Sequence, residues 1–120
     1  MNEKNTTELG NAAERVAEDF FVRKGYVVLA RNFRCARGEI DLVLWKAGEL
    51  RVVEVKGRRH FNSDEAWGPR WRAKKKKLRS ALAWYLAGCP GLEAEETVLE
   101  IVYVTQGRVS ERYDCEGFFG

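Results

Sequence analysis

The feature that most constrains the fold is a pair of strand-like runs in the middle of the chain. Residues 39–45 and 50–56 are rich in Val, Leu and Ile, and the four residues between them include Gly48. Short connections with a glycine to turn the chain are typical of β-hairpins. If residues 46–49 form the loop, Trp45 faces Leu50. Each step away from the loop then pairs the preceding residue of the first strand with the following residue of the second. The sequence therefore predicts an antiparallel hairpin with a defined register.

This register places four charged side chains on one face of the hairpin. Asp41 lies directly opposite Glu54, and Glu39 lies directly opposite Lys56. Successive side chains alternate between faces, so an apolar set is expected on the other face, packed against a helix. That set is Ile40, Leu42, Leu44, Val53 and Val55. Because directly opposed like charges destabilise a sheet, the two carboxylates require a compensating cation.

Two carboxylates beside a lysine suit the hydrolysis of a phosphate ester. Asp41 and Glu54 can hold Mg²⁺ or Mn²⁺, which polarises a phosphate oxygen and lowers the pKa of water. Lys56 can orient that water or stabilise the charge that develops on phosphorus. The same residues also fit a surface ladder of ion pairs, with Glu39 on Lys56 and Asp41 beside an arginine. A register slip of one residue would disperse the site.

The rest of the chain predicts two helices and three more strands. Periodic apolar residues indicate helices at 9–24 and 70–87, which end at Gly25 and at residues 88–91. Strands are expected at 26–30, 97–105 and 108–113, and residues 31–38 are expected as a loop or a bent strand end. The order is helix, three strands, helix, two strands. It indicates an α/β or α+β sheet with two flanking helices, in a single domain over residues 1–120.

Composition excludes several classes of protein. The three cysteines are far apart and His60 is the only histidine, so a disulfide framework or a zinc site is not expected. Any metal must be bound by carboxylates, which favours a hard ion. The apolar runs are too short to span a membrane and the amino terminus is polar, so we expect a cytoplasmic protein with no membrane partner.

Positive charge is concentrated in residues 51–80. Residues 51–80 carry eleven basic and three acidic side chains, whereas residues 81–120 carry two and seven. This asymmetry predicts a polyanion on one surface, or else a solvated helix face. The predicted phosphate contacts are Arg58, Arg59, Arg70, Arg72, Lys74, Lys75, Lys76 and Lys77. Trp67 and Trp71 could stack on unpaired bases, although tryptophans at this spacing more often pack in a core.

Several motifs resemble one bacterial protein family. They are Gly10-x-x-x-Glu14-x-x-Ala17, Gly25-Tyr26, Arg31-Asn32-Phe33-Arg34, Gly38-Glu39-Ile40-Asp41-Leu42 and Val53-Glu54-Val55-Lys56-x-Arg58. In this order and spacing they resemble the YraN family, which belongs to the PD-(D/E)xK nuclease superfamily and is similar to archaeal Holliday-junction resolvases. The resemblance implies a restriction-endonuclease-like α/β core, with a mixed central sheet flanked by helices.

The resemblance also implies roles for individual residues. Asp41 and Glu54 would be the metal-binding carboxylates and Lys56 the catalytic lysine. Glu14 would be an additional catalytic acid, whereas the residues alone suggest only an exposed helix position. The family lysine of the second helix aligns either with Trp71 or with Lys74, and Glu39 belongs to the motif without an assigned role.

These observations predict an endonuclease that cleaves DNA phosphodiester bonds with Mg²⁺ or Mn²⁺. By resemblance to the resolvases, branched, junction or single-stranded DNA is the expected substrate, and a homodimer is the expected assembly. The alternative is a non-catalytic nucleic-acid-binding module that retains the nuclease fold. A third reading, an interaction protein that uses its acidic carboxyl end, has only the charge distribution to support it.

Overall fold

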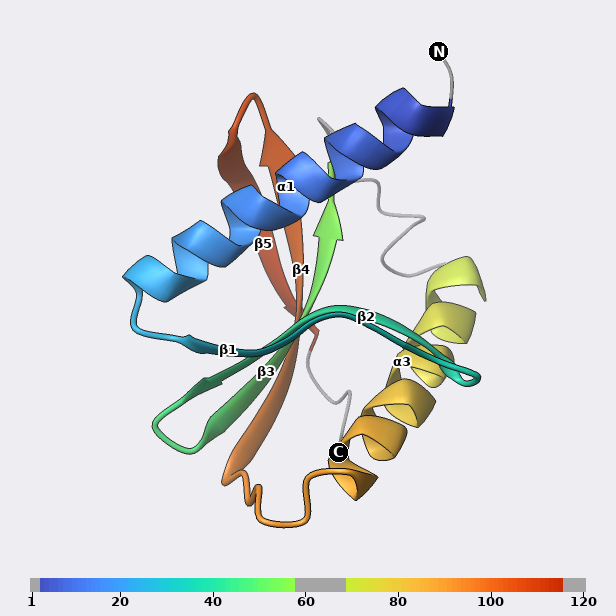
Figure 1. The fold of residues 1–120 in the computed structure, drawn as a ribbon, viewed down its shortest axis with the longest axis vertical. Coiled ribbons are helices and arrows are strands. Elements are labelled where there is room, and N and C mark those ends of the chain that lie inside the picture. The colour runs from blue at the N-terminus through green and yellow to red at the C-terminus, as the bar shows by residue number, and fades with distance from the viewer. Residues whose placement is uncertain (1–2, 58–68, 116–120) are drawn as a thin grey trace.

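The computed structural model describes residues 3–57 and 69–115, with the side chains of residues 3–10 and of Arg70 outside that description. The elements follow the predicted order of helix, three strands, helix and two strands (Figure 1). They are α1 (Glu3–Arg23), β1 (Val27–Cys35), β2 (Gly38–Lys46), β3 (Glu49–Lys56), α3 (Pro69–Ala87), β4 (Glu96–Thr105) and β5 (Arg108–Cys115).

The strands form one five-stranded mixed sheet in the order β1-β2-β3-β4-β5. Strands β3 and β4 are parallel, and the other three neighbouring pairs are antiparallel. A parallel pair needs a long crossover, and α3 lies within the crossover from β3 to β4. The α/β class with a mixed sheet between helices is thus confirmed.

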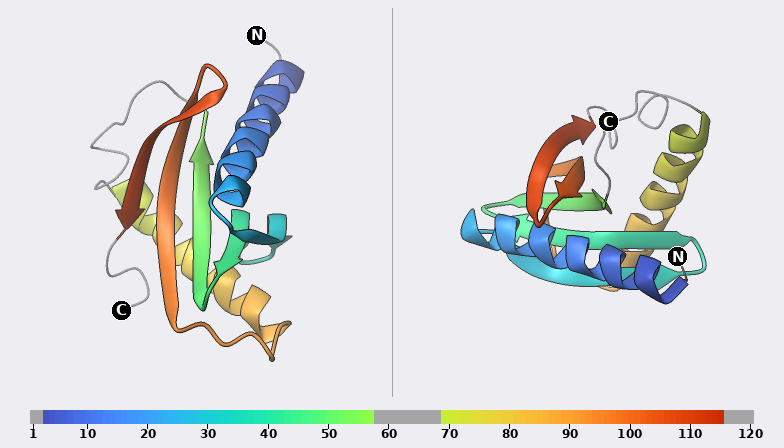
Figure 2. Two further views of the ribbon diagram at one scale, coloured as in Figure 1. Left: turned by 90° about the vertical axis from the view of Figure 1, so that its left-hand side faces the viewer. Right: turned by 90° about the horizontal axis from the view of Figure 1, so that it is seen from above.

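The two helices cover opposite faces of the sheet (Figure 2). On one face, α1 packs Ala13, Ala17 and Phe21 against a cluster that includes Leu42 and Val53. On the other face, α3 contributes a buried stripe to a second cluster around Val43, Val52 and Ile101; the stripe is Trp71, Leu78, Ala81 and Leu82. Residues that alternate along β2 and β3 therefore supply both layers.

The β2–β3 hairpin has the predicted register with a tighter turn. The backbone pairs run from Lys46–Glu49 to Leu42–Val53, so only Ala47 and Gly48 form the loop. Both have positive φ, 47° and 85°, as a two-residue type I′ turn requires. The sequence analysis assigned four residues to the loop. The register is unchanged, because the two additional residues pair with each other.

The hairpin of β1 and β2 differs from the prediction. Strand β1 continues to Cys35 through residues that were expected to form a loop or a bent strand end, with a register shift between Val28 and Ala30. Its far end packs on α3, where the rings of Phe33 and Tyr85 lie 5.2 Å apart. Ile40 was expected on the same face as Leu42 but packs in the α3 cluster, whereas Leu42 packs in the α1 cluster. The bend toward α3 accounts for this change of face.

A charged network is buried on the α1 side of the sheet. The carboxylate of Glu100 on β4 is 0% exposed and accepts hydrogen bonds from Arg51 on β3 and from Arg112 on β5. Arg112 also lies over the ring of Phe20, 4.9 Å from its centroid. One acid thus joins three adjacent strands, and both of its oxygens are occupied.

We expect the change Glu100→Ala to lower the free energy of unfolding by about 3–5 kcal/mol, because it leaves two guanidinium groups without their buried partner. The control is Glu96→Ala, at an exposed position on the same strand, which should change stability by less than about 0.5 kcal/mol. Urea denaturation measures both. Equal losses in the two variants would show that the network does not stabilise the sheet.

Candidate metal and phosphate site

Asp41 and Glu54 lie where β2 and β3 separate. The ladder ends at Leu42–Val53, one step before these two residues. Beyond it, Oδ2 of Asp41 accepts the backbone N–H of Val55 at 2.8 Å, in the place of a β2 carbonyl. Figure 1 shows β2 turning aside with β1 toward α3 while β3 continues beside β4. The predicted pair is therefore brought together, with Asp41 inserted between the diverging strands.

Burial makes it difficult for both carboxylates to be charged. Glu54 is 4% exposed, and burial together with the charge of Asp41 raises the pKa of Glu54 to about 7. Burial also raises the pKa of Asp41, with a further contribution from the charge of Glu14, although the Val55 N–H opposes this. A cation next to the carboxylate pair, Asp41 and Glu54, would stabilise its charged form.

Two lysines approach the same oxygen of Glu54. The Nζ of Lys74, from α3, lies 2.6 Å from Oε1, and the Nζ of Lys56, from β3, lies 3.9 Å from it. Burial alone would lower the pKa of Lys74, but the nearby Glu54 and Asp41 raise it above its ordinary value. Lys74 is therefore held as an ammonium ion at the carboxylate pair.

Glu14 and Glu39 occupy different surroundings. Glu14 is half-buried on α1, and its charge acts on Asp41, so it borders the site from the α1 face. The side chain of Glu39 is 66% exposed and lies 3.9 Å from Arg34. It stands beyond the end of the β2–β3 ladder, so the predicted pairing with Lys56 does not form part of the sheet.

The carboxylate pair has the donor atoms that a hard divalent cation prefers. Its raised pKa values and the ammonium of Lys74 at 2.6 Å both indicate a position that attracts positive charge. Among the described residues, no three Asp, Glu, His or Cys side chains are grouped closely enough to enclose a metal ion. The residues thus fit a cation held by two carboxylates, with Glu14 at the border.

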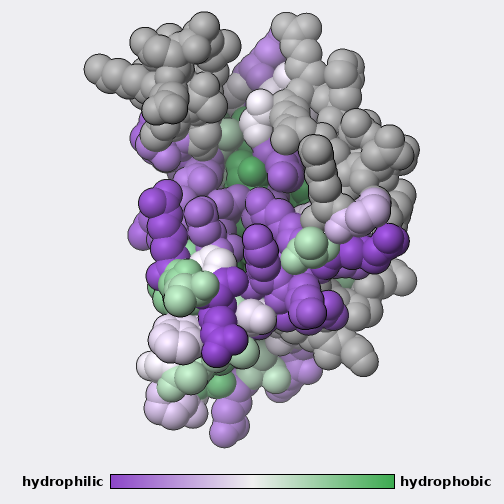
Figure 3. All heavy atoms as spheres, turned by 90° about the vertical axis from the view of Figure 1, so that its right-hand side faces the viewer, coloured by the Kyte–Doolittle hydropathy of each residue, from purple (hydrophilic) through white to green (hydrophobic). Residues whose placement is uncertain are grey.

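The predicted phosphate contacts divide into three groups. Arg58 and Arg59 lie outside the described residues, as does the side chain of Arg70. The basic helix face consists of Arg72, Lys75, Lys76 and Lys77, of which only Lys75 is half-buried and the others are exposed. Lys74 is directed to Glu54 instead. Figure 3 shows that the described surface on this side of the molecule is mostly hydrophilic.

The structure also distinguishes between the two candidates for the family lysine. Trp71 is 5% exposed and packs in the α3 core cluster, whereas Lys74 contacts Glu54. Trp67, the other tryptophan considered for base stacking, lies outside the described residues. The sequence narrowed the inward-facing lysine only to Lys74 or Lys75, because these two lie three and four residues after Trp71 and four and three before Leu78. Such spacing puts both on the inward face of the helix.

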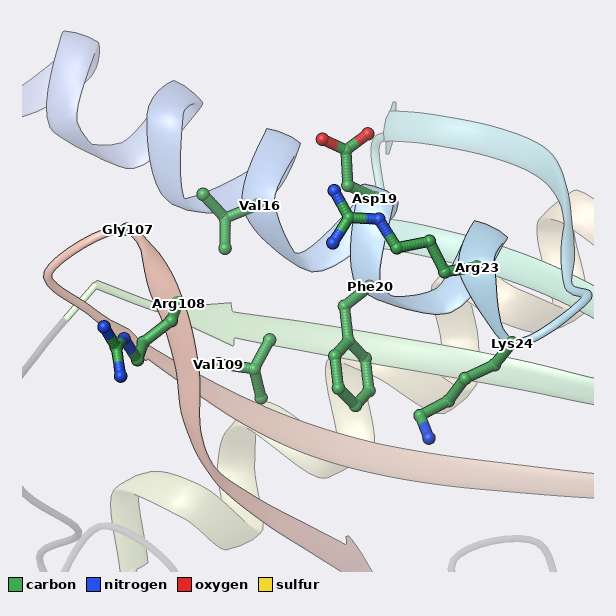
Figure 4. A pocket seen from close by; sticks show the side chains of 8 residues that line it. All are labelled: Val16, Asp19, Phe20, Arg23, Lys24, Gly107, Arg108 and Val109. Carbon is green, nitrogen blue, oxygen red and sulfur yellow. The ribbon is translucent and has the colours of Figure 1, made fainter.

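A separate groove lies between the end of α1 and the β4–β5 turn (Figure 4). It has a volume of about 480 Å³ and is lined by Val16, Asp19, Phe20, Arg23, Lys24, Gly107, Arg108 and Val109. The ring of Phe20 lies 4.9 Å from the amine of Lys24 and the same distance from the guanidinium of Arg112. The groove is distinct from the carboxylate pair, whose residues do not line it.

The fold and site define an α/β protein with a mixed five-stranded sheet and a carboxylate pair at a strand fork. Comparison with known sequences identifies its family: the family model described as "Uncharacterised protein family UPF0102" matches residues 13–115. The chain belongs to the UPF0102 family. This is the family called YraN in the sequence analysis, so the predicted family membership is confirmed.

Curated relatives support the same assignment. A UPF0102 protein of Petrotoga mobilis is 33% identical over 107 residues, which cover 89% of this chain and 95% of the relative. One of Methylobacillus flagellatus is 42% identical over 71 residues, covering 59% and 63%. One of Synechococcus is 55% identical over 49 residues, covering 41% and 40%. In the parts of the chain that the structure describes, neither helix has an apolar stretch that could cross a membrane.

The raised pKa of Glu54 predicts a pH dependence of stability. Because the folded state holds this proton up to about pH 7 and the unfolded state releases it near its ordinary value, the stabilisation is complete at low pH and is lost as the pH rises through 7. The unfolding free energy should therefore fall from about pH 5 to about pH 8, on the order of 2–3 kcal/mol more in the wild type than in Glu54→Gln.

Urea denaturation in EDTA at several pH values measures this difference. The comparison between variants removes the contributions of other titrating groups, which the two chains share. If the difference in unfolding free energy between wild type and Glu54→Gln stays constant with pH, Glu54 does not have a raised pKa in the folded state.

Proposed function

We propose that this protein is a metal-dependent endonuclease of the restriction-endonuclease-like class that hydrolyses DNA phosphodiester bonds. The observation that carries the proposal is the carboxylate pair at the strand fork, with Lys56 and Lys74 on one oxygen of Glu54. The order of elements, with a parallel β3–β4 pair and a helix on each face, is compatible with that fold. Family membership supports it through the resemblance described above.

In this proposal each residue has a defined task. Asp41 and Glu54 would hold a divalent cation, Mg²⁺ or Mn²⁺, which when bound would supply Lewis-acid chemistry to the phosphate and to water. Lys56, whose side chain is 20% exposed, orients the attacking water and stabilises charge that develops on the phosphate. The Val55 N–H fixes the carboxylate of Asp41, and Glu14 borders it from α1.

The basic helix face provides the proposed contact with DNA. Arg72, Lys76 and Lys77 are exposed on the same helix that carries Lys74. Lys77 is three residues after Lys74, so a phosphate held at Lys77 would be the contact nearest the carboxylate pair. Contacts of this type give affinity that is independent of sequence and sensitive to salt. The preference for branched or junction DNA, and a two-fold dimer that makes two symmetric cuts, are proposed from the resemblance to resolvases.

A second function is favoured by the same exposed cations. If the protein is a non-catalytic nucleic-acid-binding module, the basic helix face is its functional surface and the carboxylate pair is not used. Binding would then be unchanged by EDTA and by Glu54→Gln. Binding of a labelled four-way junction, measured with and without EDTA, separates the two functions, since only the endonuclease also cleaves the junction in Mn²⁺.

We expect Asp41→Asn to abolish both Mn²⁺ binding in calorimetry and cleavage of junction, flapped or single-stranded DNA. The amide keeps the size of the side chain and can still accept the Val55 N–H, but it cannot supply the charge that holds the cation. The affinity for DNA in EDTA should remain within about twofold of the wild type.

The matched control is Asp19→Asn, an exposed acid on α1. It should bind Mn²⁺ and cleave as the wild type does. Equal Mn²⁺ binding by wild type and Asp41→Asn would remove Asp41 from the site, and unchanged cleavage by Asp41→Asn would overturn the proposed function.

A further inference from the structure

Lys74 reaches the carboxylate pair from the other layer of the fold. It extends from α3, and its Nζ lies 2.6 Å from Oε1 of Glu54, closer than the 3.9 Å of Lys56. The Lys74 side chain is nevertheless 44% exposed, whereas that of Glu54 is 6% exposed. A long, half-exposed side chain can turn away into solvent without disturbing the core, whereas the Glu54 side chain is enclosed by its neighbours.

An ammonium and a divalent cation compete for the same oxygen. Metal ions of the hard type lie about 2.0–2.6 Å from their oxygen ligands, which is the region that Nζ of Lys74 occupies. Two cations on one carboxylate oxygen repel each other strongly where burial excludes water. The ammonium must therefore leave Glu54 for a metal to bind through that oxygen.

The released ammonium has a destination on its own helix. Lys77, three residues after Lys74 on α3 and therefore on the same side of the helix, is exposed and belongs to the basic helix face, where the proposed polyanion binds. A phosphate bound there compensates the charge of Lys74 after it has left Glu54. Metal and nucleic acid would then each favour the state that the other requires, which is a positive coupling between two sites.

We propose that Lys74 is an internal counter-cation of Glu54, displaced by a divalent metal ion and taken up by a DNA phosphate, so that metal and DNA binding reinforce each other. The inference rests on the proposed function, because it takes the carboxylate pair as the metal site. Without metal and DNA, Lys74 stabilises the buried acid and blocks the site.

Calorimetry with Mn²⁺ on the full chain tests the competition. Lys74→Gln and Lys74→Met remove the ammonium, and each should tighten Mn²⁺ binding roughly tenfold. Lys74→Arg keeps a competing charge and should stay near the wild type. The control Arg79→Gln removes one charge from an exposed position of the same helix and should change the Kd by less than about twofold. A merely structural Lys74 would give weaker binding when removed, so unchanged or weaker binding in both neutral variants overturns the inference.

A second titration tests the coupling with DNA. Adding a short duplex should tighten Mn²⁺ binding to the wild type, and this effect should be much smaller in Lys74→Gln, where no ammonium needs a new partner. Equal enhancement in both chains would contradict the transfer of Lys74 to phosphate.

The outcomes also distinguish this inference from the function it rests on. If the wild type and Asp41→Asn bind Mn²⁺ equally, the metal site itself fails. If binding depends on Asp41 but Lys74→Gln and Lys74→Met match the wild type, the counter-cation role alone fails.

Discussion

The hydrogen bond from the Val55 N–H to Asp41 determines how the site is built. A carboxylate replaces a backbone carbonyl at the point where the β2–β3 ladder ends, so the two strands can separate without leaving that donor unpaired. The separation lets β3 continue beside β4 while β2 and β1 bend onto α3. It also fixes the Asp41 carboxylate next to Glu54. The chemistry proposed for the carboxylate pair depends on this one position, where the Asp41 side chain accepts a hydrogen bond in place of a backbone carbonyl.

The position of the fork between the two helices explains which further groups reach it. Glu14 acts on Asp41 from α1, and Lys74 contacts Glu54 from α3. One helix thus adds negative charge and the other positive charge to the same buried pair. The helices lie on opposite faces of the sheet (Figure 2), so these two residues, distant in sequence, approach the carboxylate pair from different layers.

Sequence patterns predicted what depends on neighbouring residues and on periodicity. The glycine turn and strand alternation were sufficient for the β2–β3 register, and hence for the proximity of Asp41 and Glu54. The end of the ladder and the face taken by Ile40 were not predictable in this way, because both result from the packing of the β1–β2 hairpin on α3. Lys74 was placed among solvent-facing cations because a run of four lysines conceals which one points inward. The roles of the site residues remain predictions from the resemblance and the geometry.

Two buried glutamates show why the identity of the compensating cation matters. Glu100 is fully enclosed and bonded by the guanidinium groups of Arg51 and Arg112, which hold it in a fixed, planar geometry across three strands. Glu54 is almost as buried but is compensated by lysines, whose compact ammonium groups sit on flexible stems and exchange readily with another cation. The arginines therefore suit a structural role for Glu100, whereas the lysines fit the ligand-binding role that we propose for Glu54. In the proposed exchange of cations, the burial of Glu54 is what would couple metal binding to phosphate binding.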